Sequence, residues 1–348
     1  MYSHIKQFLK GIIMKKNNEN QKVLSVSVAA YNLEKLIEQN LKSWINKEVM
    51  DKIEVLVVDD GSKDSTPDIV AKYEKKYPGV IKLIKQKNAG PGSTVNTGIK
   101  NATGKFFRMV DGDDWVETEN LPEYIHDIEN SKADMILTDY EIYDNSTGKV
   151  FETVRFDIEP NKMHQFDDIS KGIHPQMHAV TYRTDILKNK NIVLDNGFYT
   201  DTEYLLLPLE YINKVEYYNI NIYVYRVGQA TQSVSIPSMQ KNIGMHSIVL
   251  ERLLNHYNES CDRLSEAKKQ YLIRMIAWVA DVHLGTLLTF EMNKKQINKI
   301  KEFNKELEEK NIDIYNEYKK SKKMKLLLNS KYLLCRLVSK LYIRKLTK

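Results

Sequence analysis

Residues 23–138 alternate short apolar runs with stretches of helical periodicity, and this alternation constrains the fold more than any other feature of the chain. The apolar runs have the length of buried strands, and the residues between them are enough for a helix. The runs are Val23 to Ala30, Ile53 to Val58, Val80 to Ile84, Phe106 to Val110 and Met135 to Thr138. We therefore predict an α/β fold with a mostly parallel sheet, flanked by helices and joined by right-handed crossovers.

Acidic residues directly follow two of these runs. They are Asp59 and Asp60 after the second run, and Asp111, Asp113 and Asp114, with Gly112 among them, after the fourth. Ligands of parallel α/β sheets bind outside the carboxyl ends of the strands, so both groups lie at the expected binding edge. Buried carboxylates are costly unless something pairs with them, and a divalent cation held with a substrate diphosphate would do so. The alternative is that these aspartates only cap turns.

The clean alternation is lost beyond residue 138. Residues 139–236 have mixed patterns, and helical periodicity dominates from there to the end of the chain. We expect an N-terminal tail over residues 1–22, a domain over 23–236 and a helical C-terminal region over 237–348. The domain is expected to divide into two halves, over residues 23–138 and 139–236.

The composition favours a cytoplasmic protein. The chain has 348 residues, of which 42% are hydrophobic, and its two cysteines, Cys261 and Cys335, form neither a disulfide framework nor a zinc pattern. No run of about 18 apolar residues predicts a transmembrane helix. The run Phe8 to Met14 is too short for a signal peptide and is interrupted by Lys10. Residues 1–13 are expected to be a tail or a consequence of start-site choice.

The segment from Lys319 to Lys348 carries eleven Lys and Arg residues and no Asp or Glu, interleaved with leucines. A basic, apolar segment of this kind favours contact with an anionic membrane surface, which would make the protein peripheral on the inner face of the cell membrane. The alternatives are a helical tail packed on its own domain or on another subunit. Nucleic acid is less favoured because no recognised binding motif accompanies the charge. The sequence indicates no oligomeric state.

Several separate motifs occur in an order that resembles the family-2 glycosyltransferases, over roughly residues 23–236. They read VSVAAYNLEKLIEQNLKSW, IEVLVVDDGSKDST and NAGPGSTVNTGIKNATGKFFRMVDGDDW, followed by VTYRTDILKNKNI, FYTDTEYLLLPL and YRVGQATQSVS. The resemblance implies a GT-A-like, Rossmann-like fold, a UDP-sugar donor, Mn²⁺ or Mg²⁺, and inversion at the anomeric carbon. The implied acceptor is a surface glycan such as capsule, teichoic acid or exopolysaccharide, on a lipid carrier.

The resemblance also implies that residues 23–138 are the nucleotide-binding half of the domain and residues 139–236 the acceptor-binding half. One carboxylate of the Asp59–Asp60 pair would accept from the uracil N3–H, and the other would orient nearby backbone. Asp113 would be the direct metal ligand, with Asp111 contacting ribose or metal through water, while Asp114 would accept from backbone N–H groups. The full donor set is Ala30, Tyr31, Asn32, Asp59, Asp60, Asn88, Gly90, Asp111, Gly112 and Arg226. Tyr31 would stack on the base, although a buried tyrosine is the alternative.

The chain departs from the family pattern in the stretch 93–96, where many relatives carry a basic residue and this chain has none. The diphosphate contact would then fall to Lys85, Lys87, Arg108 or Arg226. Arg226 suits it because the guanidinium is permanently charged and forked. With Gln232 and Ser233, Arg226 resembles a mobile loop that closes over the donor; an exposed hairpin end is the alternative.

Inverting transfer needs one general base to take the proton of the acceptor hydroxyl. The family usually carries Glu-Asp at the start of a helix, with the aspartate as base. Here Thr200 replaces the glutamate and Asp201 keeps the key position, so Asp201 is the expected base and Glu203 the fallback. The alternative is that Asp201 only caps the helix.

Weaker candidates for the acceptor side are His178, Gln232 and Ser233. Two rival functions stay open. A sugar nucleotidyltransferase can share the sheet and the carboxylates, but it would carry a glycine-rich basic loop where this chain reads Tyr31-Asn32-Leu33-Glu34. A catalytically inactive glycosyltransferase-like scaffold is the non-enzymatic rival, although the retained aspartates argue against it.

Overall fold

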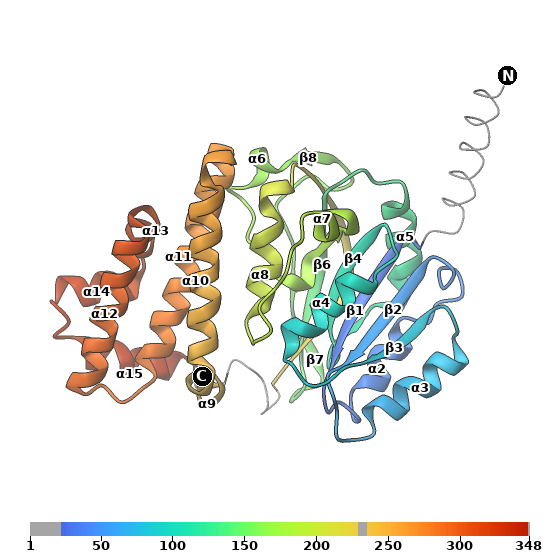
Figure 1. The fold of residues 1–348 in the computed structure, drawn as a ribbon, viewed down its shortest axis with the longest axis horizontal. Coiled ribbons are helices and arrows are strands. Elements are labelled where there is room, and N and C mark those ends of the chain that lie inside the picture. Colours follow the sequence, from blue (N-terminus) through green and yellow to red (C-terminus); the bar gives the residue numbers. More distant parts are fainter. Residues whose placement is uncertain (1–21, 229–234, 347–348) are drawn as a thin grey trace.

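The computed structural model describes residues 22–228 and 235–346. A ten-stranded sheet with helices on both faces forms one part of the molecule, and a block of helices packs beside it (Figure 1). The strands along the sheet are β3 (Ile81–Lys85), β2 (Ile53–Asp59), β1 (Leu24–Ala30), β4 (Phe106–Asp111), β9 (Val180–Arg183), β6 (Met135–Asp144), β10 (Lys214–Val227) and β5 (Trp115–Val116). Two further strands, β7 (Lys149–Val154) and β8 (Met163–Gln165), pair with β6 and β10.

The first half of the sheet is the predicted parallel half. Strands β3, β2, β1 and β4 are all parallel. The apolar runs of β2, β1 and β4 are buried on both faces by flanking helices, whereas the edge strand β3 is only partly buried. The order reverses after β1, because β2 and β4 lie on its two sides, and a crevice at such a switch point is where α/β sheets bind ligands.

The second half of the sheet is mixed. The short strand β9 runs antiparallel between β4 and β6, so β6 is again parallel to β4, and β10 is parallel to β6. The expected loss of clean alternation after residue 138 thus corresponds to β6, which continues to Asp144, and to hairpin-like additions at the edge. β10 extends over 14 residues and carries register shifts between Tyr218 and Tyr223.

Helices cover both faces of the sheet. They are α2 (Ile37–Ser43), α3 (Thr66–Lys76), α4 (Pro91–Asn101), α5 (Leu121–Glu129), α6 (Phe166–Ile169), α7 (Thr184–Asn189) and α8 (Thr200–Leu206). α3, α4 and α5 each have a proline in the first turn, where its missing N–H costs nothing.

The region after β10 is helical, as expected. Its helices are α9 (Ile236–Lys241), α10 (Ile243–Ser260), α11 (Glu266–Leu288), α12 (Lys294–Lys310), α13 (Ile312–Tyr318), α14 (Lys322–Asn329) and α15 (Cys335–Leu346). By length and composition α11 could cross a membrane, but 78% of its most apolar window is buried inside the protein, as in a core helix. α10, α13 and α15 pack against it, so α11 is the centre of this block.

Candidate functional site

The acidic loop between β4 and β5 is held by neighbours that leave no room for a side chain at its second position. A Cβ on Gly112 would lie 2.6 Å from the carbonyl oxygen of Ala29, at the end of β1. Asn40 of α2 is fully buried, and its side-chain amide donates to the carbonyl oxygens of Asp111 and Asp114 at 3.2 and 2.9 Å. Sequence reasoning missed Asn40, although it is a polar residue on a helix face shared with Ile37 and Leu41.

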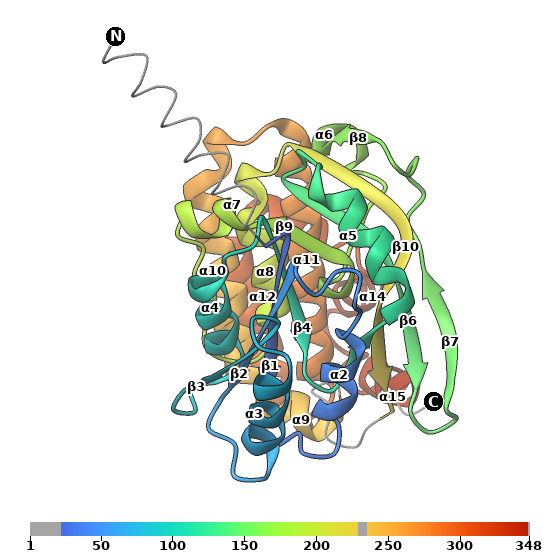
Figure 2. The same ribbon diagram turned by 90° about the vertical axis from the view of Figure 1, so that its right-hand side faces the viewer.

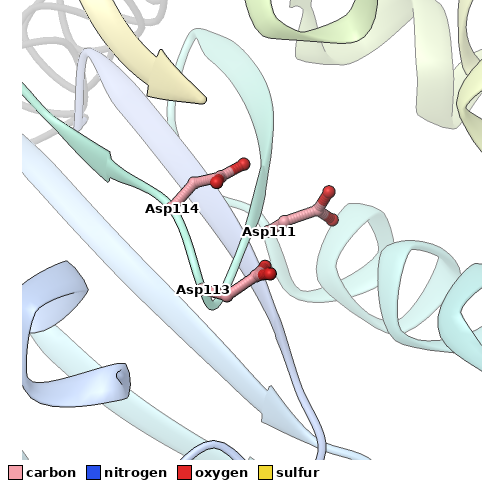
Figure 3. Close-up of side chains that lie close together, drawn as sticks. All are labelled: Asp111, Asp113 and Asp114. Carbon is pink, nitrogen blue, oxygen red and sulfur yellow. The ribbon is translucent and has the colours of Figure 1, made fainter. Parts of the chain in front are cut away.

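Asp114 faces into the protein, in contrast to its two neighbours. Its carboxylate accepts from the hydroxyl of Tyr223 at 2.6 Å and from the backbone N–H of Arg226 at 2.8 Å. Figure 3 shows the three side chains close together on the loop after β4, and of these only Asp114 is fully buried, whereas Asp111 and Asp113 are partly exposed. The predicted role of Asp114 as a structural acceptor is therefore confirmed, and Tyr223, which also accepts from the N–H of Asp111, is a second residue that the sequence did not reveal.

Asp111 and Asp113 crowd negative charge at the edge of the sheet. Burial and the charges of Asp113 and Asp201 raise the pKa of Asp111 to about 7. Burial also raises the pKa of Asp113, although the nearby Arg226 guanidinium opposes that shift. Carboxylate oxygens of Asp111, Asp113 and Asp114 all lie within 4.8 Å of one another. Since Asp114 is occupied by Tyr223 and Arg226, the two outer carboxylates fit a hard divalent cation such as Mg²⁺ or Mn²⁺.

Asp201 shares this site although it comes from a distant part of the chain. It lies in the first turn of α8, and its charge helps to raise the pKa of Asp111. Its side chain is exposed to solvent, yet enough protein surrounds it that burial raises its own pKa. The residue before the helix, Tyr199, has a left-handed backbone (φ 70°), which turns the chain sharply into α8.

Close packing fixes the loop before α8 against the start of α4. A Cβ on Gly90 or on Gly92 would lie 2.0 and 1.7 Å from the carbonyl oxygens of Asn196 and Asp195. Asn96 then forms two hydrogen bonds of 2.9 Å with the backbone of Leu194. The stretch 93–96, which lacks a basic residue, therefore lies in a helix that holds the loop before α8 in position.

The nucleotide end of the site lies at the tips of β1 and β2. Asp60 accepts from Gln86 and from the backbone N–H groups of Ala89 and Gly90, at 2.8 to 2.9 Å. Of the acidic pair, Asp60 is therefore the residue that orients backbone. Asp59 is buried and accepts only a weak bond, at 3.4 Å from the N–H of Ser62, among the described residues.

Tyr31 and Asn32 complete the nucleotide end. The Tyr31 side chain is 47% exposed at the tip of β1, so the alternative of a buried tyrosine is wrong. Asn32 has a left-handed backbone (φ 53°), and its side-chain oxygen accepts from the N–H of Lys63 at 2.8 Å. The tip of β1 is thereby tied to the loop after β2. Asn88 lies exposed in the turn that Asp60 holds.

Tyr225 is a site residue that the sequence did not reveal. Burial comes first among the causes that raise its pKa, and the charges of Asp111, Asp113, Asp114 and Asp201 all add to it, so this hydroxyl faces all four acids. Alternation along the long strand β10 could have indicated it, because Tyr223 and Tyr225 lie two residues apart.

His178 lies behind Tyr225 and not on the acceptor surface, which corrects its predicted role. Its ring is buried and stacks on Tyr225 with 4.2 Å between ring centroids. Burial and the nearby Arg108 lower the pKa of His178 to about 3, so the ring is neutral. We assign it to the support of Tyr225.

The structure corrects one of the expected diphosphate ligands, Arg108, and leaves Lys85 and Lys87 as predictions. Arg108 is completely buried and donates to Thr138, Thr181 and the carbonyl oxygen of His178. Its position in the centre of β4, between β1 and β9, explains why it cannot reach the edge. Lys85 and Lys87 are exposed near the end of β3, at the outer margin of the sheet.

Arg226 belongs to the wall of the site. It ends β10, is 6% exposed, and donates to the carbonyl oxygen of Asp113, to Asn145 and to Gln39 at 2.6 to 2.8 Å. Its guanidinium also lies 4.6 Å from the ring centre of Trp115. Arg226 was expected to contact the diphosphate from a mobile loop. Its guanidinium instead supports the acidic loop. Gln232 and Ser233 lie outside the described residues.

Glu203, the fallback base, has a structural role instead. It is completely buried, and its two oxygens accept from Arg252 of α10 and from the backbone N–H of Asp195, each at 2.5 Å. These bonds join α8, the loop before it and the helical block. A carboxylate with both oxygens so occupied cannot approach an acceptor hydroxyl, which leaves Asp201 as the only acidic residue of α8 that faces the site.

Part of the chain is similar in sequence to a known protein family. The model of Glycosyl transferase family 2 matches residues 25–189. EpsH of Bacillus subtilis is 35% identical over 130 residues, which are 37% of this chain and 37% of EpsH. The poly(ribitol-phosphate) beta-N-acetylglucosaminyltransferase TarS of Staphylococcus aureus is 28% identical over 190 residues, 54% of this chain and 32% of TarS. The chain thus spans about a third of the length of these curated relatives.

Solved structures agree with the fold. The crystal structure of S. aureus TarS 1–349 in complex with UDP has a TM-score of 0.61 at 21% identity, covering 93% of this chain and 92% of that one. The same region in complex with UDP-GlcNAc has a TM-score of 0.60 at 19% identity, covering 89% and 92%. The GT-A-like fold and the helical C-terminal region are therefore shared across nearly the whole of both chains.

Proposed function

Residues 25–189 make this chain a member of glycosyl transferase family 2, and we propose that it transfers a sugar from a UDP-sugar to a hydroxyl of a surface glycan, with inversion. The observation that carries the proposal is the meeting of Asp111, Asp113 and Asp201 in one site, seen in the charge that Asp201 exerts on Asp111. Carboxylates from two distant elements that repel one another would be selected against unless a ligand used them.

The donor would bind along the tips of β1, β2 and β4. Tyr31 would stack on the base, and Asp59 would accept from the uracil N3–H, because Asp60 is committed to the turn at Ala89 and Gly90. A Mn²⁺ or Mg²⁺ ion held by Asp113 and Asp111 would supply positive charge for the departing diphosphate. Asn40, Tyr223 and Arg226 would keep the loop that carries these carboxylates in place before the donor arrives.

Asp201 would act as the general base. Its raised pKa strengthens it as a proton acceptor, and its exposure leaves it open to an incoming hydroxyl. It would take the proton as the acceptor oxygen attacks the anomeric carbon from the side opposite the diphosphate. Tyr225, which faces the same four acids, would border the space that the transferred sugar occupies.

The acceptor class rests on relatives. TarS is named as acting on poly(ribitol-phosphate), and a poly(ribitol-phosphate) beta-glucosyltransferase of Bacillus spizizenii is 34% identical over 116 residues. We infer that this chain glycosylates a teichoic acid, capsule or exopolysaccharide that is assembled on a lipid carrier. The family match argues against the alternative of a sugar nucleotidyltransferase. The alternative of a catalytically inactive scaffold is tested by the experiment below.

The test is release of UDP from a panel of UDP-sugars with Mn²⁺, combined with binding of UDP and Mn²⁺ by calorimetry. Asp201→Asn should lower release by about 10²- to 10⁴-fold, the usual contribution of a general base, and leave the affinity for UDP and Mn²⁺ nearly unchanged. Glu203→Gln is the matched control, because it removes a negative charge from the same helix, two residues away. It should retain transfer and lose about 1–3 kcal/mol of stability.

Full activity of Asp201→Asn would overturn the assignment of the base. No release of UDP by the unaltered protein from any donor, together with normal binding of UDP and Mn²⁺, would identify the chain as a scaffold.

A further inference from the structure

The last two helices expose an apolar surface that nothing in the described chain covers. Leu333, Leu337 and Leu341 recur every four residues and are 86%, 51% and 55% exposed. Leu334 and Leu326 add to the same end of the chain at 40% and 47%. Leu333 lies in the turn before α15, and Leu337 and Leu341 lie on α15 itself. Isolated exposed leucines are ordinary, but a row of them along a short segment marks a contact surface. We call this surface the leucine row.

Basic side chains accompany the leucine row without acidic neighbours in sequence. Arg336, Lys340 and Arg344 repeat with the same spacing of four, so they lie beside the leucines on the outward side of α15. Residues 319–346 contain no Asp or Glu. The acidic groups that face this segment from other helices are Asp281, which pairs with Lys323, Glu317, which pairs with Lys320, and Glu308, whose charge reaches Tyr332. Both ion pairs involve lysines that precede α15. The surface is therefore apolar and positively charged at once.

The opposite side of α15 is fixed to the protein. Cys335, Val338 and Ser339 are buried, and the Ser339 hydroxyl donates to the carbonyl oxygen of Leu288 at 2.7 Å. Tyr342 lies against Gly285 of α11. α15 therefore packs on its own domain through the opposite side, and the leucine row takes no part in that packing.

The leucine row lies at the same end of the molecule as the donor site. Figures 1 and 2 both show α15 and α9 at the end to which the carboxyl tips of β1 and β2 point. Hydrogen bonds agree with this placement. Gln240 of α9 donates to the carbonyl oxygen of Thr289 at 2.9 Å, one residue beyond the Leu288 carbonyl that Ser339 of α15 contacts. α15 and the donor edge of the sheet thus lie at one end of the molecule.

We propose that the leucine row and its basic side chains dock on an anionic lipid bilayer, with the donor edge of the sheet held toward the membrane. Leucines enter the boundary between headgroups and acyl chains, and Lys and Arg beside them attract anionic headgroups. A bilayer fits both features of the surface, whereas a second copy of this chain would bring the same positive charge against it. The proposal does not depend on the reaction and extends it, because such docking brings a lipid-linked acceptor to Asp201.

The test is flotation of the full chain with vesicles of phosphatidylcholine alone or with 30% phosphatidylglycerol added, on the order of typical anionic membranes. Binding is expected only with the anionic lipid and should fall as salt is raised. Leu337→Ser with Leu341→Ser should abolish flotation. Lys340 and Lys345 are exposed lysines of α15, and Lys340→Gln with Lys345→Gln should weaken binding about 30-fold, since each is worth about 1 kcal/mol near an anionic surface.

Matched controls change the same chemistry at the opposite end of the sheet and of the helical block. Lys132→Gln with Lys171→Gln removes two exposed charges, and Ile312→Ser removes an apolar side chain that is 51% exposed. Both controls should float like the unaltered protein, and thermal unfolding should verify that every variant folds. Equal flotation of all variants, or none for the unaltered protein, would overturn the proposal. So would a leucine variant that converts a dimer to a monomer without affecting flotation.

Discussion

The carboxyl edge of the sheet and the helical C-terminal region treat charge in opposite ways. At the edge, the carboxylates of Asp111, Asp113 and Asp201 lie close together, and the positive charge of Arg226 offsets only part of their negative charge. In the helical region the buried histidines His246 and His283 are held neutral, and the positive charge lies outside on α14 and α15. The comparison teaches that a binding site for a charged ligand can be recognised by partly buried side chains of like charge that repel one another. A docking surface is recognised instead by exposed side chains of one charge that have few oppositely charged neighbours.

The largest effect that can test this contrast is expected at Asp113. Asp113→Asn should lower UDP release by 10³-fold or more, on the order expected when the charge stabilisation of a leaving group is lost. Its free energy of unfolding without metal should be unchanged or higher, because the charge of Asp113 raises the pKa of Asp111 and thus opposes folding in the ionised form. Activity assays and urea unfolding measure the two quantities.

The control for Asp113 is an aspartate that hydrogen bonds already satisfy. Asp60→Asn should destabilise the protein by about 1–3 kcal/mol, since Gln86, Ala89 and Gly90 lose a charged acceptor. Similar stability losses in both variants would contradict the distinction between repelling and satisfied carboxylates.

A smaller effect is expected at the nucleotide end. Tyr31→Ala should raise KM for the donor by about tenfold, because stacking of one base on an aromatic ring is worth about 1–3 kcal/mol. Since the ring is 47% exposed and packs little, stability should not change. Tyr31→Phe keeps the ring and should behave like the unaltered protein in the same kinetic assay. A KM for Tyr31→Ala equal to that of the parent would remove the ring from the donor site.

The donor edge was largely predictable from the sequence because its strands are short, apolar on both faces and punctuated by Asp and Gly. The positions of Asp60, Asp111 and Asp113 at the ends of β2 and β4 followed from that pattern alone. Asp201 could be assigned only through the family resemblance, and its approach to Asp111 is a property of the tertiary fold.

Long polar side chains were the residues that the sequence could not place. Arg226, Arg108 and Glu203 are charged, and charged residues are rarely buried, so the pattern suggested ligands. Each is buried because it forms hydrogen bonds with a residue far away in sequence, such as Gln39 for Arg226 or Arg252 for Glu203. No local pattern encodes such pairs. The leucine row differs, since its apolar and basic composition was legible and only its orientation required the fold.

The smallest effect concerns the neutral histidine pair of the helical region. His246 of α10 and His283 of α11 have ring nitrogens 3.3 Å apart, and the ring of His246 also lies against Tyr199, two residues before Asp201. Burial lowers the pKa of His246 to about 4, and burial with the neighbouring ring lowers that of His283 to about 3. In the unfolded chain both pKa values return to about 6.5, so the unfolded state binds more protons between these limits.

Stability contributed by this pair is therefore complete above pH 6.5 and is lost as the pH falls toward 4. The slope approaches about 1.4 kcal/mol per pH unit for each histidine within the window. Carboxylates with raised pKa values, such as Asp111, change stability in the opposite direction, so the pair must be measured as a difference. His246→Phe with His283→Phe keeps two rings and removes both protons. Urea unfolding from pH 7.5 to 5 should then show a flatter decline than in the parent. Parallel declines would mean that the histidines are charged in the folded protein, and the contrast between a neutral helical interior and a charged sheet edge would fail.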